Sequence, residues 1–307
     1  MKGNFHQPYQ ITTLPNDTHL KILELKNFGL LDPSKPYILD LSCFKALKKL
    51  IITGTVNKTY WIQGLNDCFS LEVVELKNCA LTGSEEISIL DMSRLRNIKE
   101  LFIQSKPNNP FKIQNLNTCS FLEKLRLQFC ELLADLKING SQNALMPKSL
   151  EQIFLSSVLL HQPLRLQNCL KLKTLIVTRL MTNEKKFSPV EGLRFCITLE
   201  KISIVCSSDF FSNEGLKDEI ANLPESLIEI NLSSNRFEDF NRLLDSKLPK
   251  LNKLFLRDNG IRYLSEKLFN LPPCCTIDLR LNRINFLEIK SFSSISENLK
   301  NKIRIIT

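Results

Sequence analysis

The fold is decided by the stretch Cys119-Ser120-Phe121-Leu122-Glu123-Lys124-Leu125-Arg126-Leu127-Gln128-Phe129-Cys130. This stretch reads C-x-x-L-x-x-L-x-L-x-x-C, and Cys68 to Cys79 is a second full copy with Val74 at the middle core position. Three later copies end in asparagine, at Asn235, Asn259 and Asn282. A motif that returns with the same inner spacing along a chain predicts a repeat architecture.

The repeats open at apolar residues that lie 22 to 28 positions apart when successive numbers are subtracted. Units of roughly 20–29 residues are typical of leucine-rich repeats. Over residues 20–285 the chain therefore resembles the leucine-rich repeat family. The resemblance implies an α/β solenoid, a horseshoe with a parallel concave β-sheet of about eleven strands and mixed helical, 3-10 and extended convex returns. The opening residues are Leu20, Leu47, Leu71, Ile98, Leu122, Leu150, Leu172, Leu199, Leu227, Leu251 and Cys274.

The two ends of the chain and the longer returns depart from the repeat. Residues 1–19 are expected to cap the solenoid, and residues 286–307 to form a C-terminal cap or tail in which Ile303-x-Ile305 has the pattern of one more strand. Helical periodicity predicts helices over residues 84–95 and 212–223. Residues 106–110 contain two prolines and are expected to be a short non-helical return.

The cysteines follow the repeat register, which predicts buried free thiols in the stack. Cys68, Cys119, Cys169 and Cys196 each precede an opening leucine by three positions, and Cys43 precedes Leu47 by four. Cys274 and Cys275 are adjacent, and we expect them in the core. With no C-x-x-C pair and only three histidines, neither a metal site nor any other cofactor is expected.

Composition bears on location and partners. The first residues lack the apolar core of a signal peptide, and no apolar run is long enough to span a membrane. We therefore expect a cytoplasmic protein, or one translocated into a host cell. The net charge of +9 is spread over dispersed lysines, which favours a solvated surface over a nucleic-acid site. The partner expected is a protein, and the chain itself is expected to be a monomer.

The expected binding surface lies on the concave face, the default binding surface of a solenoid. In the central stripe of that face Phe102, Arg126, Phe154 and Ile176 come from consecutive repeats, and Phe129 would extend the patch. Aromatic residues with arginine are typical of interface anchors. The alternative is a sheet face on which β-propensity alone selects Phe and Ile.

Sequence motifs of catalysis are missing, so we expect no enzyme activity. The nine glycines are spread singly, with no phosphate-binding loop, and no G-x-S-x-G or H-E-x-x-H motif occurs. Trp61 is expected to pack on the convex side, and the lone His161 to be a surface or packing residue.

Two more specific resemblances lead to different functions. The cysteine-containing repeats resemble those of F-box substrate receptors, and Leu14-Pro15 followed by Ile22 is similar to the start of an F-box. That resemblance implies a ubiquitin-ligase substrate receptor in which residues 14–50 are helical. The whole chain also resembles leucine-rich repeat effectors of intracellular bacterial pathogens, which implies a virulence scaffold that binds a host protein and a C-terminal tail that carries a translocation signal.

Overall fold

The structure is a computed structural model, and it describes residues 2–4, 19–26, 37–54, 60–81, 89–133, 145–182, 188–206, 214–238, 241–264, 267–268, 271–273, 275–284 and 303–306. The chain forms two compact units. The first comprises Met1–Leu150 with Ser156–His161, and the second comprises Glu151–Leu155 with Gln162–Thr307. Each unit is described by itself.

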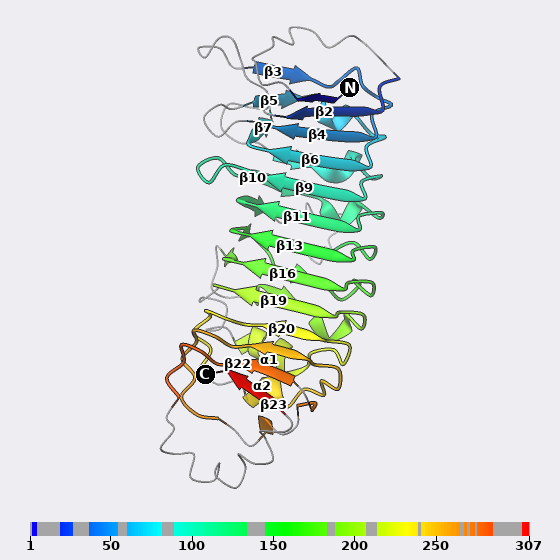
Figure 1. Cartoon of the computed structure of the whole chain (residues 1–307). Coiled ribbons are helices and arrows are strands. Elements are labelled where there is room, and N and C mark those ends of the chain that lie inside the picture. Colours follow the sequence, from blue (N-terminus) through cyan, green and yellow to red (C-terminus); the bar gives the residue numbers. More distant parts are fainter. Residues whose placement is uncertain are drawn as a thin grey trace. The chain divides into compact units, whose positions relative to one another are not determined.

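In the first unit, each repeat contributes one strand to a parallel sheet (Figure 1). Neighbouring strands pair in register, so that Val74 faces Leu101 and Leu101 faces Leu125. The parallel sheet expected of a leucine-rich repeat solenoid is therefore confirmed here. The strands, in sheet order, are β1 (Lys2–Asn4), β2 (Ile22–Lys26), β4 (Lys49–Thr53), β6 (Val73–Lys77), β9 (Glu100–Gln104) and β11 (Lys124–Gln128).

The second unit has the same arrangement. Its last strand contains Ile303 and Ile305, which confirms the further strand expected in the tail. The expected cap at the other end contains β1, which adds one strand beside β2. The strands of the second unit, in sheet order, are β13 (Gln152–Ser156), β16 (Thr174–Thr178), β19 (Lys201–Val205), β20 (Glu229–Asn231), β21 (Lys253–Phe255), β22 (Cys275–Asp278) and β23 (Ile303–Ile306).

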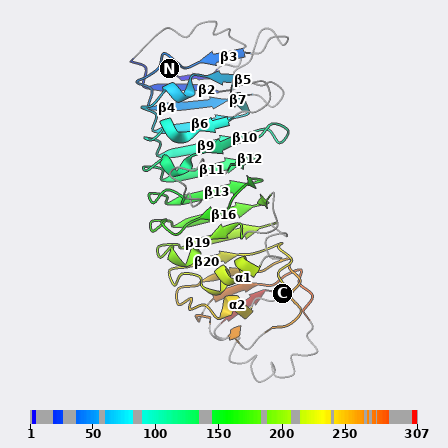
Figure 2. The same cartoon turned by 180° about the vertical axis from the view of Figure 1, so that it is seen from behind.

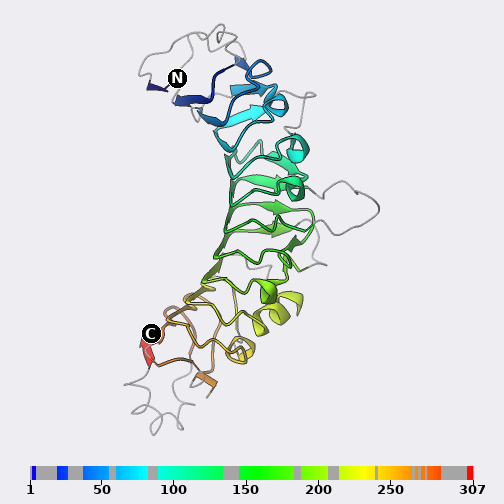
Figure 3. The ribbon, with the colours of Figure 1, turned by 90° about the vertical axis from the view of Figure 1, so that its right-hand side faces the viewer.

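Alternation along each strand separates the core from the outer face, by which we mean the sheet face that points away from the core. In β9, Leu101 and Ile103 are buried, whereas Phe102 and Gln104 on the outer face are half-buried. Each fully buried leucine or isoleucine contributes about 1.5–3 kcal/mol to the free energy of folding. Figure 3 shows the first unit from the side, with the sheet on one side of the core and the returning segments on the other.

The turn after most strands uses a residue in the left-handed region. In these repeats that residue lies two positions beyond the last core residue of the strand. Non-glycine residues rarely adopt this conformation, so the recurrence reflects the repeat geometry. The residues are Asn78, Phe129, Ser157, Arg179, Cys206, Ser234, Asp258 and Leu281.

Cysteine takes the buried positions predicted for it except at Cys43, and Cys206, for which the repeat register predicted no position, is exposed as well. All nine described cysteines are free thiols, and Cys68, Cys79, Cys119, Cys130, Cys169, Cys196 and Cys275 are buried. Cys274 lies outside the described residues. The prediction was wrong for Cys43, which is exposed, because the next residue, Phe44, fills the core at that turn with an exposed fraction of 2%.

In the last repeats, asparagine replaces cysteine after the strand and forms a ladder. The side chain of Asn259 donates to the carbonyl oxygen of Leu232 at 3.0 Å and accepts from the backbone N–H groups of Asn235 and Phe237 at 3.0 and 2.9 Å. The side chain of Asn282 repeats this pattern one turn later by accepting from the N–H of Ile261. The asparagines thus satisfy backbone groups that the turn leaves buried.

Behind the main sheet of the first unit, the returning segments pair into small parallel sheets (Figure 2). Trp61 lies in one of them, between Ile38 and Ala80 in register, so the convex-side placement expected for Trp61 is confirmed. One small sheet contains β3 (Tyr37–Asp40), β5 (Tyr60–Gln63) and β7 (Cys79–Leu81), and another contains β8 (Ile89–Asp91), β10 (Phe111–Gln114), β12 (Cys130–Leu132) and β14 (Leu159–Leu160).

Short helical turns complete the returns. One segment expected to be helical, residues 212–223, contains α1 (Glu214–Ala221), which confirms that prediction. Residues 106–110 form a turn with a Lys106–Asn109 bridge, also as expected. Other helical turns include η1 (Leu65–Asp67), η2 (Met92–Arg94), η3 (Leu116–Thr118), η4 (Leu193–Phe195) and α2 (Asn241–Leu244). Short strands in the returns of the second unit include β15 (Leu164–Arg165), β17 (Met181–Thr182) and β18 (Val190–Glu191).

The helix predicted over residues 84–95 was wrong for the part that the structure describes. Residues 89–91 form β8, and η2 follows as a single 3-10 turn. Two contacts account for the difference: β8 pairs with β10 of the next repeat, and the Asp91 carboxylate accepts from the Ser93 N–H at 2.9 Å and caps the turn. Pairing between returns thus outweighs the local helical periodicity.

Candidate functional site

Phe102 lies on the outer face of the first unit. It lies at the centre of β9, with Glu75 of β6 and Arg126 of β11 directly opposite it on the neighbouring strands. Phe102 is half-buried and Arg126 is exposed. Two of the residues predicted for the binding surface are therefore adjacent.

Two cationic groups lie over the Phe102 ring. The Lys77 ammonium nitrogen is 4.6 Å from the ring centroid, and the central guanidinium carbon of Arg126 is 5.3 Å from it. Lys77 is also 2.7 Å from a carboxylate oxygen of Glu75. Each exposed cation–π contact contributes about 0.5–1 kcal/mol. The ring therefore orders two basic side chains while leaving Arg126 accessible to solvent.

Phe129 does not lie on the outer face with these two residues. It follows β11 in the turn, with a φ of 54°, and its N–H donates to the carbonyl oxygen of Ser156 at 3.0 Å. Its side chain is half-buried. Phe129 thus belongs to the turn that returns the chain to the core.

Phe154 and Ile176 belong to the second unit. They lie at the centres of the neighbouring strands β13 and β16, and both are half-buried on the outer face. Thr174 and Thr178 flank Ile176 on the same face. Of the five predicted residues, the structure thus brings Phe102 and Arg126 into contact and places Phe154 and Ile176 on adjacent strands of the other unit.

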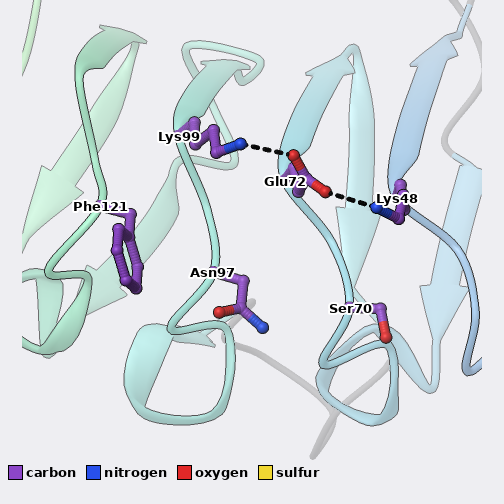
Figure 4. Close-up of a pocket in the computed structure, with 6 residues that line it drawn as sticks. All are labelled: Lys48, Ser70, Glu72, Asn97, Lys99 and Phe121. Atoms are coloured by element: carbon purple, nitrogen blue, oxygen red, sulfur yellow. Dashed lines mark hydrogen bonds and ion pairs between the residues drawn. The ribbon is translucent and has the colours of Figure 1, made fainter.

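The first unit contains a shallow pocket that the sequence analysis did not predict. Its volume is about 320 Å³, and it lies where the chain enters the strands. Figure 4 shows the Glu72 carboxylate between Lys48 and Lys99, with the Phe121 ring on a neighbouring turn. The lining residues are Lys48, Ser70, Glu72, Asn97, Lys99 and Phe121.

The three charged residues of this pocket form one ion-paired group. Glu72 accepts from Lys99 at 2.7 Å and from Lys48 at 2.9 Å. These hydrogen bonds, that of Lys99 first, lower the pKa of Glu72 to about 2. The sequence did carry a signal, because each of the three residues directly follows a repeat-opening residue and the charge alternates in sign.

Pairs of opposite charge also occur elsewhere on the strands of both units. Lysines and glutamates of neighbouring repeats pair across the strands at 2.6 to 3.1 Å. Opposite charges at facing positions stabilise a sheet, whereas like charges destabilise it. The pairs are Lys49–Glu24, Lys124–Glu100, Lys173–Glu151 and Lys201–Glu229.

His161 has a structural neighbour. One of its ring nitrogens is 3.2 Å from a Glu131 oxygen, and Lys112 lies 3.7 Å from the same oxygen.

Within the part of the chain that the structure describes, no cluster of three or more His, Cys, Asp or Glu could hold a metal ion. In those same residues, no helix has the length and apolarity needed to cross a membrane.

Comparisons with known proteins agree on the fold. No protein-family model matches the sequence, and no curated protein does either. A chain of the octameric complex of Latrophilin 3, Unc5D and the leucine-rich repeat protein FLRT2 is 15% identical, with 92% of this chain and 86% of that chain covered and a TM-score of 0.52. An internalin (inlF) from Listeria monocytogenes is 16% identical, with 84% and 80% covered and a TM-score of 0.44. The leucine-rich repeat protein LIC12759 of Leptospira interrogans is 15% identical, with 99% and 100% covered and a TM-score of 0.44.

The class of protein is thus a parallel β-solenoid. Within this class, the repeat spacing, the sheet register and the asparagine ladder give the chain the fold of a leucine-rich repeat solenoid.

Proposed function

We propose that this protein is a non-enzymatic interaction scaffold whose protein partner binds the outer face of the first unit around Phe102 and Arg126. The observation that carries the proposal is the Phe102 ring with Lys77 and Arg126 both over it. Folding does not require an aromatic ring at a solvent-facing strand position. A ring that orders an exposed arginine has the composition of an interface anchor.

The architecture supports the same function. A solenoid presents a continuous sheet face on which side chains of successive repeats lie about 4.8 Å apart, which suits contact with another protein. The FLRT2 structure that shares this fold is part of a complex with two other proteins. Phe154 and Ile176 give the second unit a further uncharged surface for such contacts.

The partner we propose is a protein of a eukaryotic host, as the resemblance to injected effectors implies. The F-box alternative required helices in residues 14–50. The described residues of that segment instead contain β2, β3 and β4, which are elements of repeats. These strands count against the substrate-receptor function and in favour of the scaffold.

The experiment that tests the proposal is a pull-down from eukaryotic lysate, read by quantitative mass spectrometry. The baits are the wild type, a Phe102→Ala, Arg126→Glu variant, and a control variant, Phe69→Ala, Arg94→Glu. The control changes the same residue types in the same unit at exposed positions away from the outer face. Circular dichroism verifies that all three baits are folded.

We expect a protein that the wild type and the control retain, and whose affinity for the Phe102, Arg126 variant, measured by calorimetry, is at least about tenfold weaker. A partner that is lost only with the control would place the site at the edge that holds the pocket. Equal retention by all three baits would show that the Phe102 cluster is not the binding site.

A further inference from the structure

In the second unit, two like charges occupy the same position of adjacent repeats. Arg257 and Arg280 each lie two residues beyond the facing pair Phe255 and Asp278, just after the strands end. The Asp258 N–H donates to the carbonyl oxygen of Arg280 at 2.9 Å, which keeps the two segments side by side there. Two like charges on neighbouring turns repel each other, so a carboxylate is needed to offset their repulsion.

Arg280 is held in place by a buried carboxylate. Its Nε and Nη2 atoms donate to the two oxygens of Asp278 at 2.9 and 2.6 Å, and its backbone N–H donates to the same carboxylate at 3.1 Å. Asp278 is 3% exposed, whereas the Arg280 side chain is 48% exposed. The Arg280 hydrogen bonds lower the pKa of Asp278, and the charge of Arg257 contributes in the same direction. One carboxylate therefore faces two guanidinium groups, the first of which is already ordered.

Three further arginines lie on the turns of these two repeats and of the repeat before them. Arg236 and Arg283 each directly follow a ladder asparagine, and Arg262 lies in the turn between them in sequence. All five arginines are exposed, as is the ring of Tyr263, at 62%. Among the residues of these turns that the structure describes, the carboxylates are Glu238, Asp258 and Asp278, so five positive and three negative charges leave a net charge of 5 − 3 = +2.

We propose that this arginine cluster (Arg236, Arg257, Arg262, Arg280 and Arg283) binds a glutamate- or aspartate-rich segment of a protein. A guanidinium group pairs with a carboxylate through two parallel hydrogen bonds, the geometry that Arg280 already forms with Asp278. A partner carboxylate beside Arg257 relieves the repulsion between the two adjacent arginines. Phe255, half-buried on the neighbouring strand, and Tyr263 offer apolar contact next to the charges.

An acidic polypeptide fits this cluster better than a nucleic acid. Three carboxylates are interspersed among the arginines. The continuous phosphate backbone of a nucleic acid would pass close to these carboxylates and be repelled by them. A polypeptide can place carboxylates opposite the guanidinium groups and uncharged side chains elsewhere. The cluster lies in the second unit and does not depend on the function proposed for Phe102 and Arg126.

The test measures binding of a fluorescein-labelled oligo-glutamate peptide to the full chain by fluorescence anisotropy at low and at physiological salt. The test variant is Arg257→Gln, Arg283→Gln, which leaves the Arg280–Asp278 pair intact. The matched control is Arg242→Gln, Lys267→Gln, which removes the same charge from the return side of the same unit, where these residues pair with Asp218 and Asp245. A single Arg257→Lys variant keeps the positive charge but removes the guanidinium N–H groups that can donate two parallel hydrogen bonds to one carboxylate. Thermal melts verify that each variant is folded.

We expect the test variant to bind the peptide about tenfold more weakly than the wild type, the control to change affinity less than about twofold, and Arg257→Lys to fall between them. If the test and control variants lost the same amount of affinity for the peptide, binding would depend only on net charge, and the proposal would be overturned. No binding by the wild type would overturn it as well. A single-stranded oligonucleotide that binds more tightly, with the same dependence on Arg257, would assign the cluster to nucleic acid instead.

Discussion

At the scale of single residues, the buried position that follows each strand is occupied by cysteine in some repeats and by asparagine in others. Cys79 and Cys130 are small side chains whose thiols lie 3.1 and 3.3 Å from the carbonyl oxygens of Lys77 and Gln128, and 3.8 and 3.7 Å from those of Ile52 and Ile103. A thiol is a weak donor. The amide of Asn259 both donates and accepts at 2.9 to 3.0 Å. In the asparagine repeats, the side chain therefore forms strong hydrogen bonds with the backbone groups of the turn. In the cysteine repeats, the side chain mainly fills space in the core.

Replacement of Asn259 by alanine should be strongly destabilising. The substitution leaves the N–H groups of Asn235 and Phe237 without their acceptor, and each buried unsatisfied group costs about 1–3 kcal/mol. We expect the free energy of unfolding to fall by about 3 kcal/mol in urea denaturation. The exposed Asn252→Ala is the control and should change the free energy of unfolding by less than about 0.5 kcal/mol. Similar values for both variants would contradict a structural role for the ladder.

At the scale of elements, a returning helix stabilises the repeat before it. The Glu219 carboxylate of α1 accepts from the N–H groups of Gly192 and Leu193 at 2.9 and 2.8 Å, where η4 begins. Gly192 has a φ of 87°, and a Cβ there would lie 2.8 Å from the Gln167 side chain. The 3-10 turn, its glycine and the next helix therefore act as one element, although 26 and 27 residues separate Glu219 from its partners.

Removal of the Glu219 carboxylate should loosen this element. We expect Glu219→Ala to lower the free energy of unfolding by about 2 kcal/mol, because two partly buried N–H groups lose a charged acceptor. Glu219→Gln keeps one acceptor oxygen and should lose about half as much. Amide hydrogen exchange would locate the effect at Gly192 and Leu193. Unchanged exchange at these two amides in Glu219→Ala would contradict the capping role.

At the scale of the whole molecule, buried thiols recur through both units and couple folding to pH. Burial raises the pKa of Cys68, Cys79 and Cys169 to about 12, and of Cys130 and Cys275 to about 11, from an ordinary value of 9.0. The unfolded chain therefore releases thiol protons above about pH 9, whereas the folded chain retains them. Their contribution to stability is fully present below pH 9 and decreases as the pH rises towards the folded-state pKa values.

We expect the free energy of unfolding to fall between pH 8 and pH 10 by about 1 kcal/mol for each buried thiol, as measured by urea denaturation under reducing conditions. In Cys169→Ala, the free energy of unfolding should fall between pH 8 and pH 10 by about 1 kcal/mol less than in the wild type. The exposed Cys43→Ala should leave that difference unchanged. A difference in Cys169→Ala equal to that of the wild type would show that the Cys169 thiol titrates normally in the folded chain.

The repeat could be predicted from sequence because each part of it is local. Alternation inside Leu125 to Leu127, an interval of 22 to 28 residues and the recurring cysteine positions together specify strand and core. Burial with a period of two can be predicted for one strand without knowing which strand lies next to it. The core leucines and most of the buried cysteines were therefore predictable.

Contacts between repeats were decided only by the tertiary structure. The two cations over Phe102 and the adjacent Arg257 and Arg280 join residues about one repeat apart. They depend on strand register and side-chain direction, which periodicity does not specify. The return strand β8 replaced an expected helix for the same reason, because pairing with β10 outweighed a local pattern. By itself the sequence determined the repeat, and the packing of one repeat on the next determined which side chains meet on the surface.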